Sequence, residues 1–117
     1  ALIATGMMVQ ETLKAADILA KEDISVTVVD MPCIKPIDEE LIEKIAKSHE
    51  LIITCEEHNV YGGLGSAVSE VTSKKSPVRM EMMGMQDTFG ESGTPNELLA
   101  KYGLNADHIV EKVKECL

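Results

Sequence analysis

The sequence predicts an α/β fold of three layers, α/β/α, in which helices cover both faces of a mostly parallel β-sheet. Short apolar, β-branched runs alternate along the chain with stretches that repeat apolar residues at helical spacing. Its 117 residues are 44% apolar and 26% charged, an ordinary balance for a folded globule. Because a chain of this length buries roughly two thirds of its unfolded surface, we expect a single domain over residues 1–117.

The first half of the chain predicts two strands and two helices. Residues 1–5 are a short apolar run that closes at Gly6, and residues 26–29 are a second, β-branched run. Between them, four apolar residues recur at helical spacing and predict the inward face of a helix: Val9, Leu13, Ala16 and Ala20. Asp38 is placed to cap the next helix. The apolar stripe of that helix is Leu41, Ile42, Ile45 and Ala46.

A third strand, a helix and a fourth strand follow. Residues 51–55 are apolar on both faces, as central parallel strands are, and we expect a loop over residues 56–61. The helix after the loop has its apolar stripe at Leu64, Ala67, Val68 and Val71. Residues 78–82 alternate apolar and charged side chains, which predicts an edge strand with one wet face.

Two helices are predicted near the end of the chain. Residues 94–97 form a capping box, and Gly103 stands where that helix should end. Asn105 opens the last helix, whose apolar stripe is Ile109, Val110, Val113 and Leu117. In a sheet of this kind ligands bind beyond the carboxyl ends of the strands. The loops expected there are residues 6–7, 30–37, 56–61 and 84–94.

Charge and cysteine usage exclude several classes of function. The net charge is −9 with Arg79 as the single arginine, so the phosphates of a nucleic acid would find few partners. No apolar run approaches the roughly 20 residues of a membrane span, and no secretory signal opens the chain. The odd set of Cys33, Cys55 and Cys116 is typical of a reduced, cytoplasmic protein.

The glycine-rich segment before the third helix is the richest local motif. Gly62, Gly63 and Gly65 could bring backbone N–H groups to a phosphate at the helix N-terminus. However, Val68 stands where the dinucleotide fingerprint needs a third glycine or alanine. We favour tight-turn and close-packing roles for these glycines over phosphate binding.

Glu56, Glu57 and His58, at the end of the third strand, could act as acid, base or metal ligands. The interpretation that we favour is that one carboxylate bonds loop backbone or a neighbouring subunit. Cys55 and His58 have metal-like spacing, but no second pair completes a zinc site. The residues therefore identify no metal ligand.

A nucleophile motif nearly forms at residues 90–94, but Thr94 replaces the last glycine of the hydrolase pattern. Ser92 is therefore expected to help turn the chain. A methionine cluster at positions 80, 82, 83 and 85 is expected in the core or at a subunit contact. No residue is assigned as catalytic.

Four motifs in a fixed order resemble the C-terminal domains of transketolases. They are Ile-Lys-Pro-Ile-Asp at 34–38, Ile-Thr-Cys-Glu-Glu-His at 53–58, Gly-Gly-Leu-Gly-Ser-Ala-Val at 62–68 and Asp-Thr-Phe-Gly-Glu-Ser-Gly at 87–93. The resemblance extends from Ile3 to about Val110. Related domains occur in 1-deoxyxylulose-5-phosphate synthase and in the β subunits of 2-oxoacid dehydrogenase E1 components.

The resemblance implies the third domain of a dimeric enzyme that transfers a two-carbon ketol unit between sugar phosphates. Thiamine diphosphate and Mg²⁺ would bind between the first two domains, so neither is expected on this chain alone. The implied partners are the N-terminal section or upstream domains and a second copy. The implied sheet has strand order 2-1-3-4, with an antiparallel first strand that precedes Ala1.

The candidate residues fall on the family's loop and interface positions, and none matches a catalytic position. They are Glu56, Glu57, His58, Tyr61, Gly62, Gly63, Gly65, Asp87, Glu91 and Ser92. Two alternatives stay open: a deoxyxylulose-phosphate synthase domain, and a free-standing module that binds a ligand or dimerises.

Overall fold

A computed structural model describes residues 1–6, 8–31, 37–59, 63–85 and 104–117, without the side chains of 57–59 and 85. Its sheet has four parallel strands in the order β2-β1-β3-β4. They are β1 (Leu2–Ala4), β2 (Val28–Asp30), β3 (Leu51–Asn59) and β4 (Arg79–Met85). The predicted fold class and strand order are confirmed.

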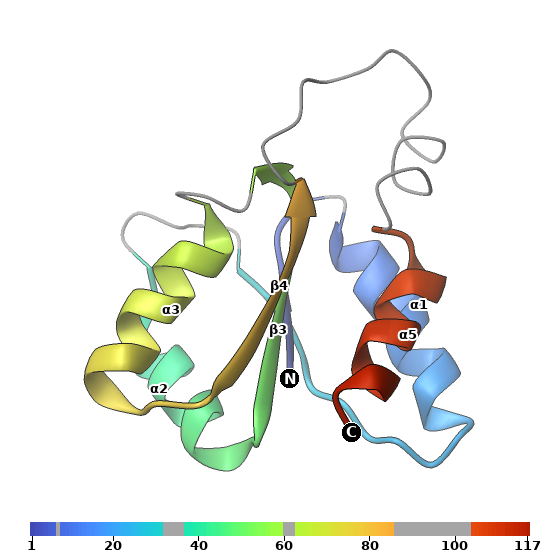
Figure 1. Ribbon diagram of the computed structural model, residues 1–117, viewed down its shortest axis with the longest axis horizontal. Helices are drawn as coiled ribbons and strands as arrows, with labels where there is room; N and C mark the ends of the chain where they lie inside the picture. Colours follow the sequence, from blue (N-terminus) through green and yellow to red (C-terminus); the bar gives the residue numbers. More distant parts are fainter. Residues whose placement is uncertain (7, 32–36, 60–62, 86–103) are drawn as a thin grey trace.

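Helices cover both faces of the sheet (Figure 1). On one face lie α1 (Met8–Ala20) and α5 (Ala106–Glu115), and on the other α2 (Glu39–Ser48) and α3 (Leu64–Lys75). Successive strand residues point to opposite faces, so Leu2 and Ala4 pack toward α1 and α5 while Ile3 packs toward α2 and α3. The core therefore consists of two apolar layers, one on each side of the sheet.

Two of the helices begin at the predicted caps. The Asp38 side chain accepts a hydrogen bond from the Leu41 N–H at 3.1 Å, and Asn105 accepts one from the His108 N–H at 3.2 Å. Each bond satisfies one backbone donor of the first helical turn. Leu117, expected in the last apolar stripe, lies beyond the end of α5 and is 77% exposed.

The inward face predicted for α1 is wrong by one position. The helix buries Met8, Glu11, Thr12, Ala15 and Leu19, and it leaves Leu13 and Ala20 exposed. Thr12 can be buried because its hydroxyl donates to the Val9 carbonyl at 2.8 Å. Because a polar residue lies on the buried face of α1, the spacing of apolar residues did not predict which residues face the core.

The loop predicted over residues 56–61 is also wrong in its first part, because β3 continues to Asn59. Four residue steps on β3, from Cys55 to Asn59, match two on β4, from Met83 to Met85. This irregularity inserts extra residues into β3 at Glu56–His58, as a β-bulge does. Among the described residues β4 pairs only with β3, which agrees with the predicted edge strand.

The helix predicted from the capping box at 94–97 lies outside the described residues. In the part of the chain that the structure covers, no helix has the length and apolar character needed to cross a membrane.

Candidate functional site

The carboxyl end of β3 meets the start of α3 through Glu56. The Glu56 side chain is 1% exposed. Its Oε1 accepts a hydrogen bond from the Leu64 N–H at 3.0 Å, and its Oε2 accepts one from the Gly65 N–H at 2.9 Å. This geometry agrees with the favoured interpretation, in which a carboxylate of this segment bonds backbone.

Helix α3 needs this carboxylate because it cannot cap itself. Its N-cap residue is Gly63, which has no side chain to accept from the first free N–H groups. A carboxylate at a helix N-terminus also interacts favourably with the helix dipole. The backbone N–H groups of Leu64 and Gly65 are therefore already hydrogen-bonded to Glu56. They belong to the glycine-rich motif that was considered as a phosphate-binding site.

Gly65 lets α3 approach the sheet closely. A Cβ at this position would lie 2.8 Å from Met82 Cγ and Sδ, and 2.9 Å from Thr54 Oγ1. By contrast, the φ angle of Gly63 is −98°, a value that any residue can adopt. Of the two described glycines of the motif, Gly65 thus has the predicted close-packing role.

Cys55, next to Glu56, is a buried and inert thiol. Burial, and secondarily the charge of Glu56, raises its pKa to about 12. Because the thiolate is the reactive form, this cysteine is unsuited to nucleophilic chemistry or metal binding at neutral pH.

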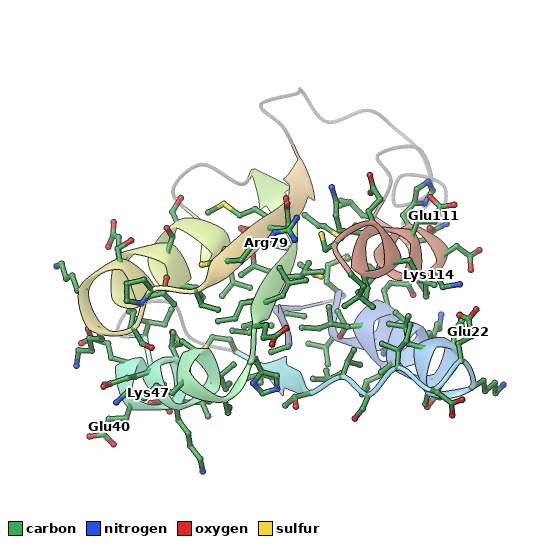
Figure 2. All side chains as sticks on the ribbon, turned by 60° about the horizontal axis from the view of Figure 1, so that its bottom comes forward. Glu22, Glu40, Lys47, Arg79, Glu111 and Lys114 are labelled. Carbon is green, nitrogen blue, oxygen red and sulfur yellow. The ribbon has the colours of Figure 1, made fainter. Side chains whose placement is uncertain are left out.

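A second buried carboxylate, that of Glu11 on α1, caps the start of α5 on the other face of the sheet. Glu11 Oε1 accepts a hydrogen bond from the Ala106 N–H at 3.1 Å, and Lys14 Nζ lies 3.0 Å from Glu11 Oε2. At the other end of the same helix pair, Lys114 Nζ lies 2.7 Å from Glu22 Oε1 (Figure 2). Sequence reasoning missed Glu11, because no local signal connects it to a helix that starts 95 residues later.

The remaining candidates are only partly placed. Glu57 and His58 lie on β3, but their side chains are outside the described part. Tyr61, Gly62, Asp87, Glu91 and Ser92 lie outside the described residues altogether. The structure therefore brings Glu56, Gly63 and Gly65 together and leaves the others as predictions.

The described residues do not fit a diphosphate and its metal. Within the described ranges no group of three His, Cys, Asp or Glu side chains could hold a metal ion. The two amides at the glycine-rich turn are occupied by Glu56.

Parallel strands with helices on both faces define a doubly wound α/β domain. The family model described as "Transketolase, C-terminal domain" matches residues 1–109. The chain belongs to this family.

Individual relatives agree with this assignment. A protein of Methanocaldococcus jannaschii, named as a transketolase C-terminal section, is 43% identical and aligns with 97% of this chain and 35% of its own length. The 1-deoxy-D-xylulose-5-phosphate synthase of Histophilus somni is 40% identical over 100% of this chain and 18% of its own. A solved split-gene transketolase, described as an inactive β4 tetramer, shares 46% identity with a TM-score of 0.91.

The alignment with the split-gene structure covers 97% of this chain and 37% of that one. The chain thus spans about a third of the length of the transketolase C-terminal section and less than a fifth of the length of the synthase.

Proposed function

We propose that this chain serves as the C-terminal part of a transketolase-type enzyme, which transfers a two-carbon ketol unit between sugar phosphates. The observation that supports the proposal is that nearly the whole chain aligns with about a third of a transketolase C-terminal section. Cofactor chemistry, with thiamine diphosphate and Mg²⁺, belongs in this proposal to the other domains. This chain contributes architecture and subunit contacts.

The proposed setting is a cytoplasmic enzyme of the pentose phosphate pathway. Its proposed partners are the domains or section that carry the cofactor and a second copy of this chain. A relative described as a β4 tetramer supports self-association. Reduced Cys55 and Cys116 are compatible with the cytoplasm.

Reconstitution tests the proposal. A cofactor section that contains both of the first two domains is assayed for ketol transfer with and without the 117-residue chain. We expect transfer only in the mixture, and no calorimetric binding of thiamine diphosphate by this chain alone. Micromolar binding by the isolated chain, or a cofactor section that is equally active without it, contradicts the proposal.

A second candidate is the corresponding domain of a 1-deoxyxylulose-5-phosphate synthase. It is favoured by 40% identity to such a synthase over the whole chain. The same reconstituted mixture distinguishes the two candidate functions. If the chain is a synthase domain, the product is 1-deoxyxylulose 5-phosphate and no ketol unit is transferred between sugar phosphates.

A further inference from the structure

The hydroxyl of Thr54 is buried beside the start of α3 without a hydrogen-bond partner in the described part of the chain. The Thr54 side chain is 0% exposed, so water does not reach the hydroxyl from outside. A buried donor that lacks an acceptor is unfavourable, and most buried polar groups in proteins are paired. The hydroxyl therefore marks a place where an added acceptor atom would be bound.

The thioether of Met82 lies at the same place. Thr54 on β3 and Met82 on β4 are register partners, so their side chains lie next to each other on one face of the sheet. Thr54 Oγ1 and Met82 Sδ both lie within 2.9 Å of the point that a Cβ on Gly65 would occupy. A thioether sulfur is only a weak acceptor, and Thr54 does not donate to it.

Met82 is the described methionine best placed to react with an oxidant. It is half-buried on β4, a strand that pairs only with β3 among the described residues. Met80 is also half-buried, but its Sδ accepts a hydrogen bond from Thr72 Oγ1 at 3.4 Å, which engages a lone pair that an oxidant would need. The other methionine side chains that the structure describes are at most 7% exposed: Met8, Met31 and Met83.

Oxidation would give Met82 the acceptor that Thr54 lacks. A sulfur lone pair attacks one oxygen of hydrogen peroxide, the S–O bond forms and the O–O bond breaks. The departing hydroxide takes the proton of the transferred oxygen and leaves as water. The sulfur is thus oxidised by two electrons to a sulfoxide, and the peroxide is reduced. The sulfoxide oxygen is polar and accepts hydrogen bonds.

The surroundings of Met82 decide where the new oxygen can lie. On the side of Gly65 the oxygen would meet the backbone of α3, because Met82 Sδ is already 2.8 Å from the position of a Cβ there. On the side of Thr54 it would meet a hydroxyl donor without a partner. Methionine is unbranched and flexible, so rotation about its terminal bonds can carry the oxygen to that side.

We propose that Met82 is an oxidation site of this chain, at which peroxide forms a sulfoxide whose oxygen accepts a hydrogen bond from the Thr54 hydroxyl. The modification places a polar group at the contact between α3 and β4, and methionine sulfoxide reductases can reverse it. The site is independent of the proposed ketol-transfer function.

Peptide mapping tests the site. The folded 117-residue chain is treated briefly with hydrogen peroxide, and each methionine is followed by tandem mass spectrometry. We expect Met82 to be oxidised at least about fivefold faster than the buried Met8, Met31 and Met83. Oxidation of the chain unfolded in urea is the control, in which these rates should become equal. A Met82 that reacts no faster than the buried methionines in the folded chain overturns the proposal.

Thr54→Val tests the hydrogen bond, because valine keeps the shape of the side chain and removes the hydroxyl. Urea unfolding is compared between the reduced form and the chromatographically purified Met82 sulfoxide of each protein. Oxidation should raise the unfolding equilibrium constant about three- to tenfold more in Thr54→Val than in the parent, since the oxygen then lacks its donor.

Thr54→Ser is the matched control, because it keeps the hydroxyl and should respond to oxidation like the parent. Each comparison is made within one protein, so a change in the stability of the reduced variant does not affect the result. An equal effect of oxidation on the parent and on Thr54→Val overturns the proposed hydrogen bond.

Discussion

Glu56, Glu11 and Thr12 show how single polar residues are accommodated in this core. Each is buried, and each has a backbone partner within 3.1 Å. Thr54 Oγ1 is the exception among the described residues, because it is buried with no hydrogen-bond partner. Buried polar groups contribute to stability only when they are paired, so the two glutamates are the most consequential of these residues.

Replacing Glu56 with glutamine tests its role as the cap of α3. Glutamine has one acceptor oxygen and one NH₂ group, so one of the two N–H donors at Leu64 and Gly65 would face another donor. We expect the free energy of unfolding to fall by about 1–3 kcal/mol in urea titrations. Amide hydrogen exchange should accelerate at Leu64 and Gly65. Glu70→Gln, at an exposed site on α3, is the control, and equal midpoints for the two variants would contradict the cap.

Gly65→Ala tests the close approach of α3 to the sheet. The new Cβ would lie 2.8 Å from Met82 Cγ and Sδ, so the helix or the methionine must move. We expect a loss of about 1–3 kcal/mol in unfolding free energy, as for other overpacked cores. The double variant Gly65→Ala/Met82→Ala should recover part of the loss, because the crowding atoms of Met82 are gone. Strictly additive effects in this double-mutant cycle would show that the two residues do not interact.

At the scale of elements, α1 ends in a motif that strains one residue. The Ile24 N–H donates to the Leu19 carbonyl at 2.9 Å and the Asp23 N–H to the Ala20 carbonyl at 3.2 Å, which is a Schellman motif. Its C′ residue is Asp23, with φ at 62°, where glycine is usually found.

Asp23→Gly should therefore raise the unfolding free energy by up to about 1 kcal/mol, because glycine adopts this conformation without a steric cost. Asp23→Val should lower it, since a β-branched residue is strained there. Asp23→Asn is the control that removes the charge but keeps the tolerance for positive φ. A Val variant as stable as the parent, by thermal and urea unfolding, would contradict this account.

Prediction of elements from sequence succeeded where apolar periodicity was not interrupted. The caps at Asp38 and Asn105 and the inward residues of α2 follow from local patterns. The strand order was implied by the resemblance to transketolase C-terminal domains and is confirmed. The prediction failed on α1 because Thr12, although polar, lies in the core, where its hydroxyl donates a hydrogen bond to the Val9 carbonyl. It also ended β3 too early, because charged residues at Glu56 and Glu57 suggested a loop where the strand continues.

The candidate site was predictable to the extent that its chemistry is local. Glu56 lies eight residues before Leu64, so a carboxylate that returns to nearby backbone was a reasonable expectation. Which glycine is crowded was not predictable, because the crowding atoms at Gly65 come from β4 and β3. Glu11 and Ala106 meet only through the packing of α1 against α5, which no local motif encodes.

At the scale of the whole molecule, the buried thiol of Cys55 couples stability to alkaline pH. Its pKa is about 12 in the folded protein against an ordinary 9.0, so between these values the folded state holds a proton that the unfolded state has released. Stability should therefore fall as pH rises from about 9 toward about 12, by up to roughly 1.4 kcal/mol for each pH unit.

Urea unfolding at a series of alkaline pH values checks this coupling. Because lysines and tyrosines titrate in the same range, the comparison is with Cys55→Ala, which should have a shallower pH slope whatever its absolute stability. Parallel slopes for the two proteins would show that the thiol does not contribute.

The pairing of α1 with α5 governs when this chain can fold during synthesis. Glu11 is made 95 residues before its backbone partner, Ala106, so one outer layer joins two distant parts of the sequence. Until α5 leaves the ribosome, α1 has neither the donor for its buried carboxylate nor the apolar side chains that cover its inner face. A nascent chain stalled before residue 104 can complete the α2–α3 side of the sheet but not the other. Folding of the domain is thus completed only after α5 has been synthesised.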